Sequence, residues 1–358
     1  MPPVSRARID LGAISRNHAL ARRLAPNSRT LAVIKANAYG HGALAVARTL
    51  AGEADAFGVA RLEEAAELRG AGIDIPILLL EGPARASEFA KAGRLGLWSA
   101  IHCQEQLQWF LDAGPMRPRR VWLKFDSGMH RLGFDVEGFR SAFARLRAER
   151  GVEEVVLMTH FARADEWTDN STSGQIARFE AACEGLDAPR SLANSAGILA
   201  WPDSHGDWVR PGILLYGATP LLGPDAPTHD LSPVMHFESR VIAIRDLAAG
   251  ESIGYGARYT AQRAMRMGVV AAGYGDGYPR AARDGTPVRV SGYTVPLAGR
   301  VSMDMLTVDL SEHPDVKVGD IVELWGEHVS ANSVATDSGT IAYELFTRMT
   351  GRAERTYR

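Results

Sequence analysis

Short aliphatic runs alternate with helix-like stretches over the N-terminal part of the chain. The stretches between the runs are rich in Ala, Glu, Leu and Arg; the one at 61–69, for example, has acidic residues in its first turns and closes on Arg69 and Gly70. Eight such runs, with helices between them, predict the strands of a parallel (β/α)8 barrel of TIM type, which takes about 250 residues. The runs are Leu31 to Ile34, Ala56 to Ala60, Ile75 to Leu80, Leu95 to Trp98, Val121 to Phe125, Val155 to Met158, Ser191 to Ala196 and Val209 to Tyr216.

The pattern changes after Pro220. Residues 221–233 are rich in Pro, Gly and Asp, as a linker would be. Beyond them apolar and polar residues alternate at strand period between Gly turns, which predicts a mostly antiparallel β domain. We place the boundary near residue 231, with the barrel in residues 1–231 and the β domain in residues 232–358. The clearest predicted strands of the second domain are Val241 to Ile244, Met267 to Ala271, Pro287 to Val290 and Ile321 to Trp325.

Composition excludes several classes of protein. The chain has 358 residues, 46% of them hydrophobic, which is enough for the cores of two domains. Lys and Arg total 40 against 42 for Asp and Glu, so there is no basic field to bind a nucleic acid. The N-terminus has no apolar signal segment, and no aliphatic run approaches the roughly 20 residues of a membrane span. We therefore expect a cytoplasmic protein that binds neither nucleic acid nor membrane.

Cysteine usage is sparse. Cys103 and Cys183 are the only cysteines, and their spacing is not that of a zinc knuckle. Two cysteines also make no disulfide framework. We expect both thiols to be reduced and structural, and we predict no metal site.

Lys35 is the most informative residue for the chemistry. It follows the run Leu31 to Ile34 and precedes a turn-like segment that ends in Tyr39 and Gly40, so it lies where a buried strand opens into a cleft. Burial disfavours the charged form of a lysine, and a partly neutral amine can attack a carbonyl and form a Schiff base. Taken alone, however, a lysine at a strand end more often extends to water. The other polar residues of the barrel decide between the two interpretations.

Further polar residues come where predicted barrel strands end. His160 follows the sixth strand, Asn194 and Ser195 follow the seventh, and Arg210 and Gly212 interrupt the eighth. Parallel barrel strands present these ends at one face, the mouth, which carries the chemistry in such barrels.

A phosphorylated ligand fits this mouth. The loops after the last two strands of such barrels often bind phosphate, and the Ser195 hydroxyl, the amides of Gly212 and Ile213 and the Tyr39 hydroxyl are suitable donors. Each of these residues also has an ordinary interpretation, as a helix cap, a bend or a loop aromatic. Together, a reactive lysine and a phosphate cradle at one mouth indicate pyridoxal phosphate.

The motifs of the chain resemble those of bacterial alanine racemases. They occur in order over nearly the whole chain, and their joint pattern is highly specific. Ser127 and Ser302 stand where some members carry another small residue. The matching stretches are Val33 to Gly42, Lys124 to Gly133, His160 to Arg163, Trp208 to Gly212, Gly254 to Gly256, Gly273 to Arg280, Gly299 to Asp304 and Tyr343 to Leu345.

The resemblance implies an isomerase that interconverts L-alanine and D-alanine on pyridoxal phosphate with two bases. In this family pattern Lys35 holds the cofactor and acts as the base on one face of the substrate, and Tyr255 acts on the opposite face. A free tyrosine, with a pKa of about 10, is a poor base and needs a cationic neighbour. The resemblance supplies one through a hydrogen-bonded chain from Arg210 through His160 to Tyr255. On residue type alone, His160 could equally be a satisfied strand-end histidine and Tyr255 a cross-strand aromatic.

The resemblance also assigns the groups around the ring and the substrate. Arg210 faces the pyridine nitrogen, and because a guanidinium keeps its proton, the ring accepts less negative charge. Arg131 clamps the substrate carboxylate beside the backbone amide of Met303. Lys124 is implied to be carbamylated and to hold Arg131; a solvated strand end is the alternative interpretation of Lys124.

The remaining implications concern the entrance and the assembly. Tyr343, which also touches the cofactor in this pattern, and Tyr274 are bulky groups that narrow the entrance and so favour a methyl side chain. The family pattern is a homodimer with shared sites, in which Tyr255 and Met303 complete the site of the partner's barrel.

Three alternatives remain open. A racemase of broader amino-acid specificity would share every catalytic residue. A decarboxylase of the same two-domain plan fits less well, because an Arg131 clamp opposes departure of the carboxylate. A non-catalytic pyridoxal-phosphate-binding protein would need the barrel alone. The sequence also leaves open whether the racemase supplies D-alanine for peptidoglycan or serves alanine breakdown.

Overall fold

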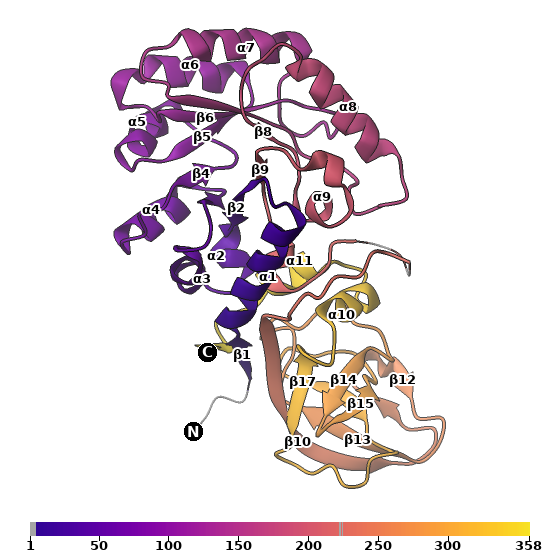
Figure 1. The fold of residues 1–358 in the computed structure, drawn as a ribbon. Coiled ribbons are helices and arrows are strands. Elements are labelled where there is room, and N and C mark those ends of the chain that lie inside the picture. The colour runs from indigo at the N-terminus through magenta and orange to yellow at the C-terminus, as the bar shows by residue number, and fades with distance from the viewer. Residues whose placement is uncertain (1–4, 222, 224) are drawn as a thin grey trace.

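Two eight-stranded sheets organise the molecule (Figure 1). The computed structural model describes residues 5–221, 223 and 225–358. Residues 1–4, and residues 222 and 224 of the predicted linker, lie outside this range. The rest of the stretch 221–233 forms neither helix nor strand, in keeping with a linker.

One sheet is the predicted parallel barrel. Its strands pair in parallel in chain order, and the last of them lies beside the first. A backbone hydrogen bond of 2.9 Å from Arg210 N to Ala193 O joins the chain beyond the last two strands. The (β/α)8 prediction is therefore confirmed. The strands are β2 (Arg29–Val33), β3 (Ala56–Val59), β4 (Ile77–Leu79), β5 (Trp98–Ile101), β6 (Arg120–Lys124), β7 (Glu154–Met158), β8 (Arg190–Ser191) and β9 (Trp208–Val209).

Three predicted barrel strands differ most from the observed ones. The run at 95–98 mostly forms the turn that ends a helix, and β5 begins only at Trp98. In the run at 191–196 only Ser191 is strand, because Asn194 caps a helix by accepting a 3.0 Å hydrogen bond from Gly197 N. In the run at 209–216 only Val209 is strand, because Pro211 has no N–H to donate to a sheet and residues 213–216 form a 3-10 helix. A buried aliphatic run does not distinguish a strand from a buried helical turn.

Helices surround the barrel, as Figure 1 shows in its upper part. Side-chain caps begin three of them: Asp10 accepts from Ala13 N at 2.9 Å, Asp135 from Gly138 N at 2.8 Å, and Asn194 from Gly197 N as described above. The helices are α1 (Leu11–Leu24), α2 (Lys35–Tyr39), α3 (Ala43–Leu50), α4 (Leu62–Gly70), α5 (Ala86–Arg94), α6 (Gln104–Asp112), α7 (Val136–Ala148), α8 (Ser171–Cys183) and α9 (Ser195–Ala200), with 3-10 turns η1 (Gly114–Met116), η2 (Pro202–Ser204) and η3 (Ile213–Tyr216).

The second sheet is the predicted, mostly antiparallel β domain, in the lower part of Figure 1. Long strand β10 crosses it and pairs with three neighbours. The elements after the linker are β10 (Met235–Leu247), β11 (Ser252–Ile253), η4 (Tyr255–Ala257), β12 (Tyr259–Thr260), β13 (Met265–Val270), β14 (Pro287–Val290), β15 (Tyr293–Pro296), β16 (Leu306–Asp309), β17 (Ile321–Trp325), α10 (Ala331–Asp337), α11 (Ala342–Thr347) and β18 (Glu354–Tyr357).

The first and last strands of the described chain meet in this second sheet. Strand β1 (Arg6–Ile9) pairs antiparallel with β10 and parallel with β18. The sequence analysis did not anticipate this pairing, because it assigned all residues before the linker to the barrel. The boundary near residue 231 stays a prediction.

The end of the barrel opposite the mouth is packed with tryptophan. The rings of Trp98, Trp122 and Trp208 lie 5.5 to 6.5 Å apart, centroid to centroid. Two guanidinium groups cover them, Arg29 at 4.2 Å from Trp208 and Arg120 at 5.3 Å from Trp98. This end of the barrel is therefore closed.

Two smaller expectations concern the thiols and the membrane. Cys103 and Cys183 are both free thiols, and Cys183 is buried. None of the helices in residues 5–221, 223 and 225–358 is long and apolar enough to cross a membrane. The cytoplasmic location stays a prediction from the sequence.

Candidate active site

A cavity of about 740 Å³ opens at the carboxyl ends of the barrel strands. Helix α11 of the second domain reaches across to line part of it. Most of the site residues predicted from the sequence lie around this one space. They are Lys35, Tyr39, Lys124, Arg131, His160, Ser195, Arg210, Gly212, Ile213 and Tyr343.

Lys35 begins a left-handed turn rather than closing a strand. Strand β2 ends at Val33, and φ is between 51° and 54° at each of the residues 36–39. Left-handed backbone costs roughly 1–2 kcal/mol per non-glycine residue, so such a turn persists only if its surroundings hold it. Two side chains do so: Glu64 accepts from Ala36 N at 2.7 Å, and Asn37 accepts from Ala43 N at 2.8 Å.

His41 fastens the same turn from inside. Its Nδ1 lies 2.9 Å from Tyr39 O and 3.1 Å from Ala38 O, and because both partners are acceptors, Nδ1 carries the proton. Burial lowers the pKa of His41 to about 3, so the ring is neutral. It stacks on Tyr216 with 4.6 Å between centroids and meets the edge of Phe346 of α11. The sequence analysis quoted His41 in a motif but gave it no role.

Hydroxyl groups converge on Gly212. Ser195 Oγ accepts from Gly212 N at 2.8 Å and from Leu214 N at 3.3 Å. A Cβ added at Gly212 would lie 2.8 Å from the Tyr39 hydroxyl oxygen and 3.8 Å from Ser195 Oγ, so a side chain there would fill the space between them. Burial raises the pKa of Tyr39, which keeps its hydroxyl a neutral donor. These are the groups that the sequence analysis predicted to bind a phosphate, and the phosphate site stays a prediction.

Arg210 is buried at the floor of the cavity, with 3% of its surface exposed. Its Nη1 donates to Ser191 Oγ at 2.6 Å, and its Nη2 donates to Thr159 O at 2.7 Å and to Leu192 O at 3.0 Å. In the described part of the chain no hydrogen bond uses Arg210 Nε. Burial lowers the pKa of Arg210 to about 10, so it remains a cation at neutral pH.

His160 receives a hydrogen bond from Arg210. Arg210 Nη2 lies 3.4 Å from His160 Nδ1, and a guanidinium can only donate. Burial, followed by the charges of Arg210 and Lys124, holds the pKa of His160 well below its usual range. His160 is therefore neutral, with its remaining proton on Nε2.

Lys124 ends strand β6 inside the cavity, with 6% of its surface exposed. Burial, followed by the charges of Arg210 and Arg131, lowers the pKa of Lys124 to about 8. It is not a solvated strand end. A substantial fraction of its amine is neutral near pH values of about 8.

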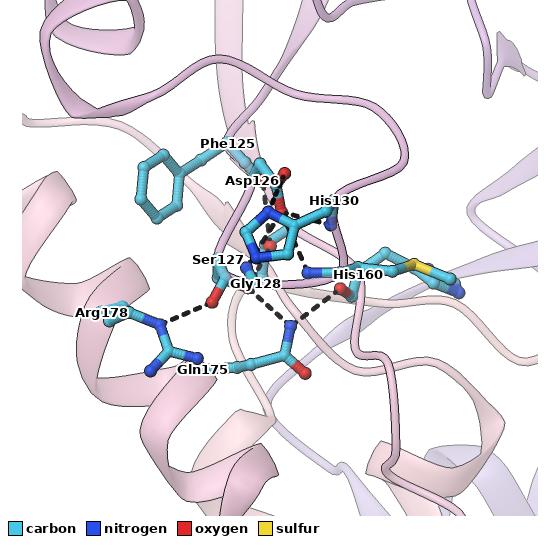
Figure 2. Close-up of polar contacts among 10 residues, drawn as sticks. Phe125, Asp126, Ser127, Gly128, His130, His160, Gln175 and Arg178 are labelled. Carbon is cyan, nitrogen blue, oxygen red and sulfur yellow. Dashed lines mark hydrogen bonds and ion pairs between the residues drawn. The ribbon is translucent and has the colours of Figure 1, made fainter.

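The loop after β6 carries Arg131. Asp126 Oδ1 accepts from the backbone N–H of Gly128, Met129 and His130 at 2.9, 3.0 and 3.0 Å, as Figure 2 shows in part. Although burial acts in the opposite direction, these amides hold the pKa of Asp126 below its usual value. The loop is thus built around an ionised carboxylate.

Three predicted residues do not lie in this cavity. Tyr255, Tyr274 and Met303 belong to the β domain and are 73%, 38% and 52% exposed. Tyr255 instead lines a second hollow of about 590 Å³ together with Arg300 and Ser302. Within one chain, the structure therefore does not bring Tyr255 to Lys35.

Two family models cover almost the whole chain. The model described as alanine racemase, N-terminal domain, matches residues 9–220, and that described as alanine racemase, C-terminal domain, matches residues 234–357. The chain belongs to the alanine racemase family. Alanine racemases are pyridoxal-phosphate-dependent isomerases.

Individual relatives agree with this membership. An alanine racemase of an Azoarcus species is 56% identical over 95% of each chain, and a catabolic alanine racemase of Pseudomonas putida is 53% identical over 96% of each. Among solved structures, the biosynthetic alanine racemase of Pseudomonas aeruginosa has a TM-score of 0.96 at 51% identity over 99% of each chain. An alanine racemase of Bartonella henselae, described with covalently bound pyridoxal phosphate, has a TM-score of 0.89 at 30% identity over 100% of each chain.

Proposed function

We propose that this chain interconverts L-alanine and D-alanine with pyridoxal phosphate bound in the mouth of the barrel. The observation that carries the proposal is one cavity with Lys35 just beyond β2 and hydroxyl and amide groups around Gly212. Lys124, Arg131 and Arg210 line the same cavity, which suits a ligand with a phosphate and a carboxylate.

The residues of the cavity fit this cofactor. The Tyr39 and Ser195 hydroxyls and the amides of Gly212 and Ile213 would hold its phosphate, and Tyr343 would close over it, since the Tyr343 ring lies 5.8 Å from that of Tyr39. When bound, pyridoxal phosphate supplies an electron-withdrawing ring that acidifies the α-proton of the amino acid. Arg210 Nε, which makes no hydrogen bond among the described residues, would face the ring nitrogen and would give up no proton.

Two groups on opposite faces of the substrate transfer the proton. Lys35 Nζ takes or returns the α-proton on one face, and the Tyr255 oxygen acts on the other. Because Arg210 donates to His160 Nδ1, the His160 Nε2–H can donate to the Tyr255 oxygen and stabilise its ionised form. Arg131 and the Met303 amide bind the substrate carboxylate and orient the α-proton.

We propose that the neutral amine of Lys124 adds to carbon dioxide and loses one proton to water, which forms a carbamate. Its pKa of about 8 leaves neutral amine to react, and the product anion would lie among the cations of Arg131 and Arg210. Such an anion would hold Arg131 in place and offset part of the local positive charge.

We further propose a homodimer in which Tyr255 and Met303 of one chain complete the barrel mouth of the other. The exposure of both side chains on the β domain supports this arrangement. Mixing Lys35→Ala with Tyr255→Phe, under conditions that let subunits exchange, tests it. Each parent has two defective sites, whereas a mixed dimer with shared sites has one intact site, so activity should reappear. Mixed dimers without activity would show that both bases belong to one chain.

The alternatives differ in measurable ways. A broader racemase would turn over serine and larger amino acids, whereas Tyr343 at the entrance favours alanine. A non-catalytic carrier of the cofactor would show no exchange of the alanine α-proton in heavy water.

The physiological role is a separate question, because relatives named catabolic and biosynthetic are both similar to this chain. Deleting the gene and testing for D-alanine auxotrophy separates the biosynthetic from the catabolic role.

A further inference from the structure

Gln175 of helix α8 joins two loops at the barrel mouth (Figure 2). Its side chain is buried, with 2% of its surface exposed. Its Nε2 donates to Ser127 Oγ at 3.0 Å and to His160 O at 3.3 Å, and its Oε1 accepts from Ala162 N at 2.9 Å. The backbone partners fix the amide orientation, because Ala162 N can only donate and His160 O can only accept.

The bond to Ser127 continues as a directed chain of hydroxyl groups. Thr159 Oγ1 donates to Phe125 O at 3.0 Å, so the Ser127 hydroxyl donates to Thr159 Oγ1 across their 2.7 Å contact. Ser127 Oγ is thereby left to accept from the Gln175 amide. Each hydroxyl of the chain both donates and accepts, and the chain needs an N–H donor at position 175 to be complete.

The two segments that Gln175 joins carry different parts of the proposed chemistry. Ser127 starts the loop that bears Arg131, the clamp for the substrate carboxylate. His160 follows β7 and is the neutral link from Arg210 to the second base. Arg178, one turn further along α8, also fastens the loop by donating from Nε to Ser127 O at 2.6 Å.

We propose that Gln175 is a positioning residue that sets the place of Arg131 relative to His160. The inference rests on the proposed racemase function for the roles of those two residues. Gln175 itself acts through the loop and not on the substrate. Its amide is the only group, among the side-chain hydrogen bonds of the described residues, that donates to both the Ser127 side chain and the His160 backbone.

Gln106 of α6 provides a matched control. It is also buried, at 4% exposure, and its Oε1 accepts from His102 N at 3.1 Å. Its Nε2 donates to Glu81 O at 2.9 Å and to Pro83 O at 3.1 Å, so it joins the loop after β4 to the end of β5. The amide orientation is fixed in the same way, although both acceptors of the Gln106 Nε2 are backbone carbonyls. The loop after β4 lines the cavity through Leu80 and Glu81, but neither segment carries Arg131 or His160.

The test compares the isosteric variants Gln175→Glu and Gln106→Glu in the cofactor-loaded enzyme. In each, a carboxylate oxygen replaces the amide donor. It faces Ser127 Oγ and His160 O in Gln175→Glu and two backbone carbonyl oxygens in Gln106→Glu, so both variants should lose thermal stability. Only Gln175→Glu should raise KM for alanine, on the order of tenfold with a smaller loss in kcat, because the loosened clamp contacts substrate and transition state alike. Gln106→Glu should keep KM within about twofold. An unchanged KM in Gln175→Glu, or equal rises in both variants, would overturn the proposal.

Lowering the pH of the assay separates loss of the hydrogen-bond donor at position 175 from a general loosening of the loop. A protonated glutamate regains an O–H donor, so the KM of Gln175→Glu relative to the unaltered enzyme should fall as the pH is lowered. The variant Gln175→Met has no such group, and its relative KM should be raised and independent of pH. Equal pH dependence in the two variants would contradict a role for the donor.

Hydrogen exchange tests the positioning without any activity. Gln175→Glu should raise amide exchange in residues 126–134 and 160–163, whereas Gln106→Glu should raise it near residues 81–84. If the proposed function is wrong, the unaltered protein will not racemise alanine. If only the role of Gln175 is wrong, the unaltered protein will be active, and Gln175→Glu will change neither amide exchange nor KM.

Discussion

The arginines and lysines at the two ends of the barrel differ in their partners. At the closed end, Arg29 and Arg120 stack on tryptophan rings and both approach Glu154, at 4.0 and 3.9 Å. At the mouth, none of the ion pairs within the described residues includes the four cations around the cavity. These are Lys35, Lys124, Arg131 and Arg210.

The difference separates the part of the barrel that stabilises it from the part that does chemistry. Stacked, paired arginines over an aromatic core add to the free energy of unfolding. Lys124 and Arg210, which are buried and form no ion pair with a carboxylate among the described residues, reduce it. Burial, followed by the charges of Arg210 and Arg131, lowers the pKa of Lys124. An anionic ligand removes that cost at the mouth, so we expect mutations at the mouth to change activity and mutations at the closed end to change stability.

The largest effect should follow from Lys35→Ala. Removing the amine takes away both the attachment of the cofactor and one base, so alanine racemisation should fall by at least about a thousandfold. The free energy of unfolding of the cofactor-free protein should change little, because the side chain is half-buried and unpaired at the mouth. Racemisation assays and denaturant titration check the two parts. Residual activity within about tenfold of the unaltered enzyme would place the chemistry elsewhere.

Trp122→Ala makes the converse test at the closed end. Trp122 is fully buried against Trp98 and Trp208, so truncation leaves a cavity that should lower the free energy of unfolding by about 3–5 kcal/mol. At a temperature where the variant is folded, kcat and KM should stay within about threefold of the unaltered values. A large loss of activity per folded molecule would show that the two ends are coupled.

The pH dependence of stability tests whether the charge buried at the mouth destabilises the fold. The pKa of folded Lys124 is about 8, against 10.5 for an unperturbed lysine, so the unfolded chain binds more protons between these values. The free energy of unfolding of the cofactor-free protein should therefore rise with pH across this window, by up to about 3 kcal/mol from this group. Lys124→Met should lack this rise. Denaturant titrations in carbon-dioxide-free buffer measure both, and parallel curves for the two proteins would contradict the burial of a charged Lys124.

Local patterns predicted the regular elements well where the run and the strand coincide. Strands β14 and β17 match their predicted ranges, and β6 and β7 differ by one residue at one or both ends. The last two barrel strands were wrong in extent, because buried aliphatic residues fill helix α9 and turn η3 as readily as a strand. The pairing of β1 with β18 joins residues almost a chain length apart, and no local pattern reports it.

The candidate site was predicted through its motifs rather than through its geometry. The motifs contain the residues that line the cavity at the mouth, such as Lys35 and Arg210. Two features escaped the sequence analysis: the left-handed turn held by His41, and the bridge made by Gln175. The Gln175 bridge depends on groups that only the folded chain brings near. The bonds of His41 reach backbone oxygens of the neighbouring Ala38 and Tyr39, but they require a left-handed backbone that no local pattern signals. Glutamine within an amphipathic helix resembles any polar helical residue, so its burial could not be foreseen from the sequence.

Mapping the cofactor attachment tests the central claim most directly. The purified protein, loaded with pyridoxal phosphate, is reduced with borohydride, digested and analysed by mass spectrometry. The account predicts a single pyridoxyl group on Lys35, at the mouth, and none on Lys124, which lies in the same cavity and makes an internal control. An adduct on Lys124 or on any lysine outside the mouth, with Lys35 unmodified, would contradict it.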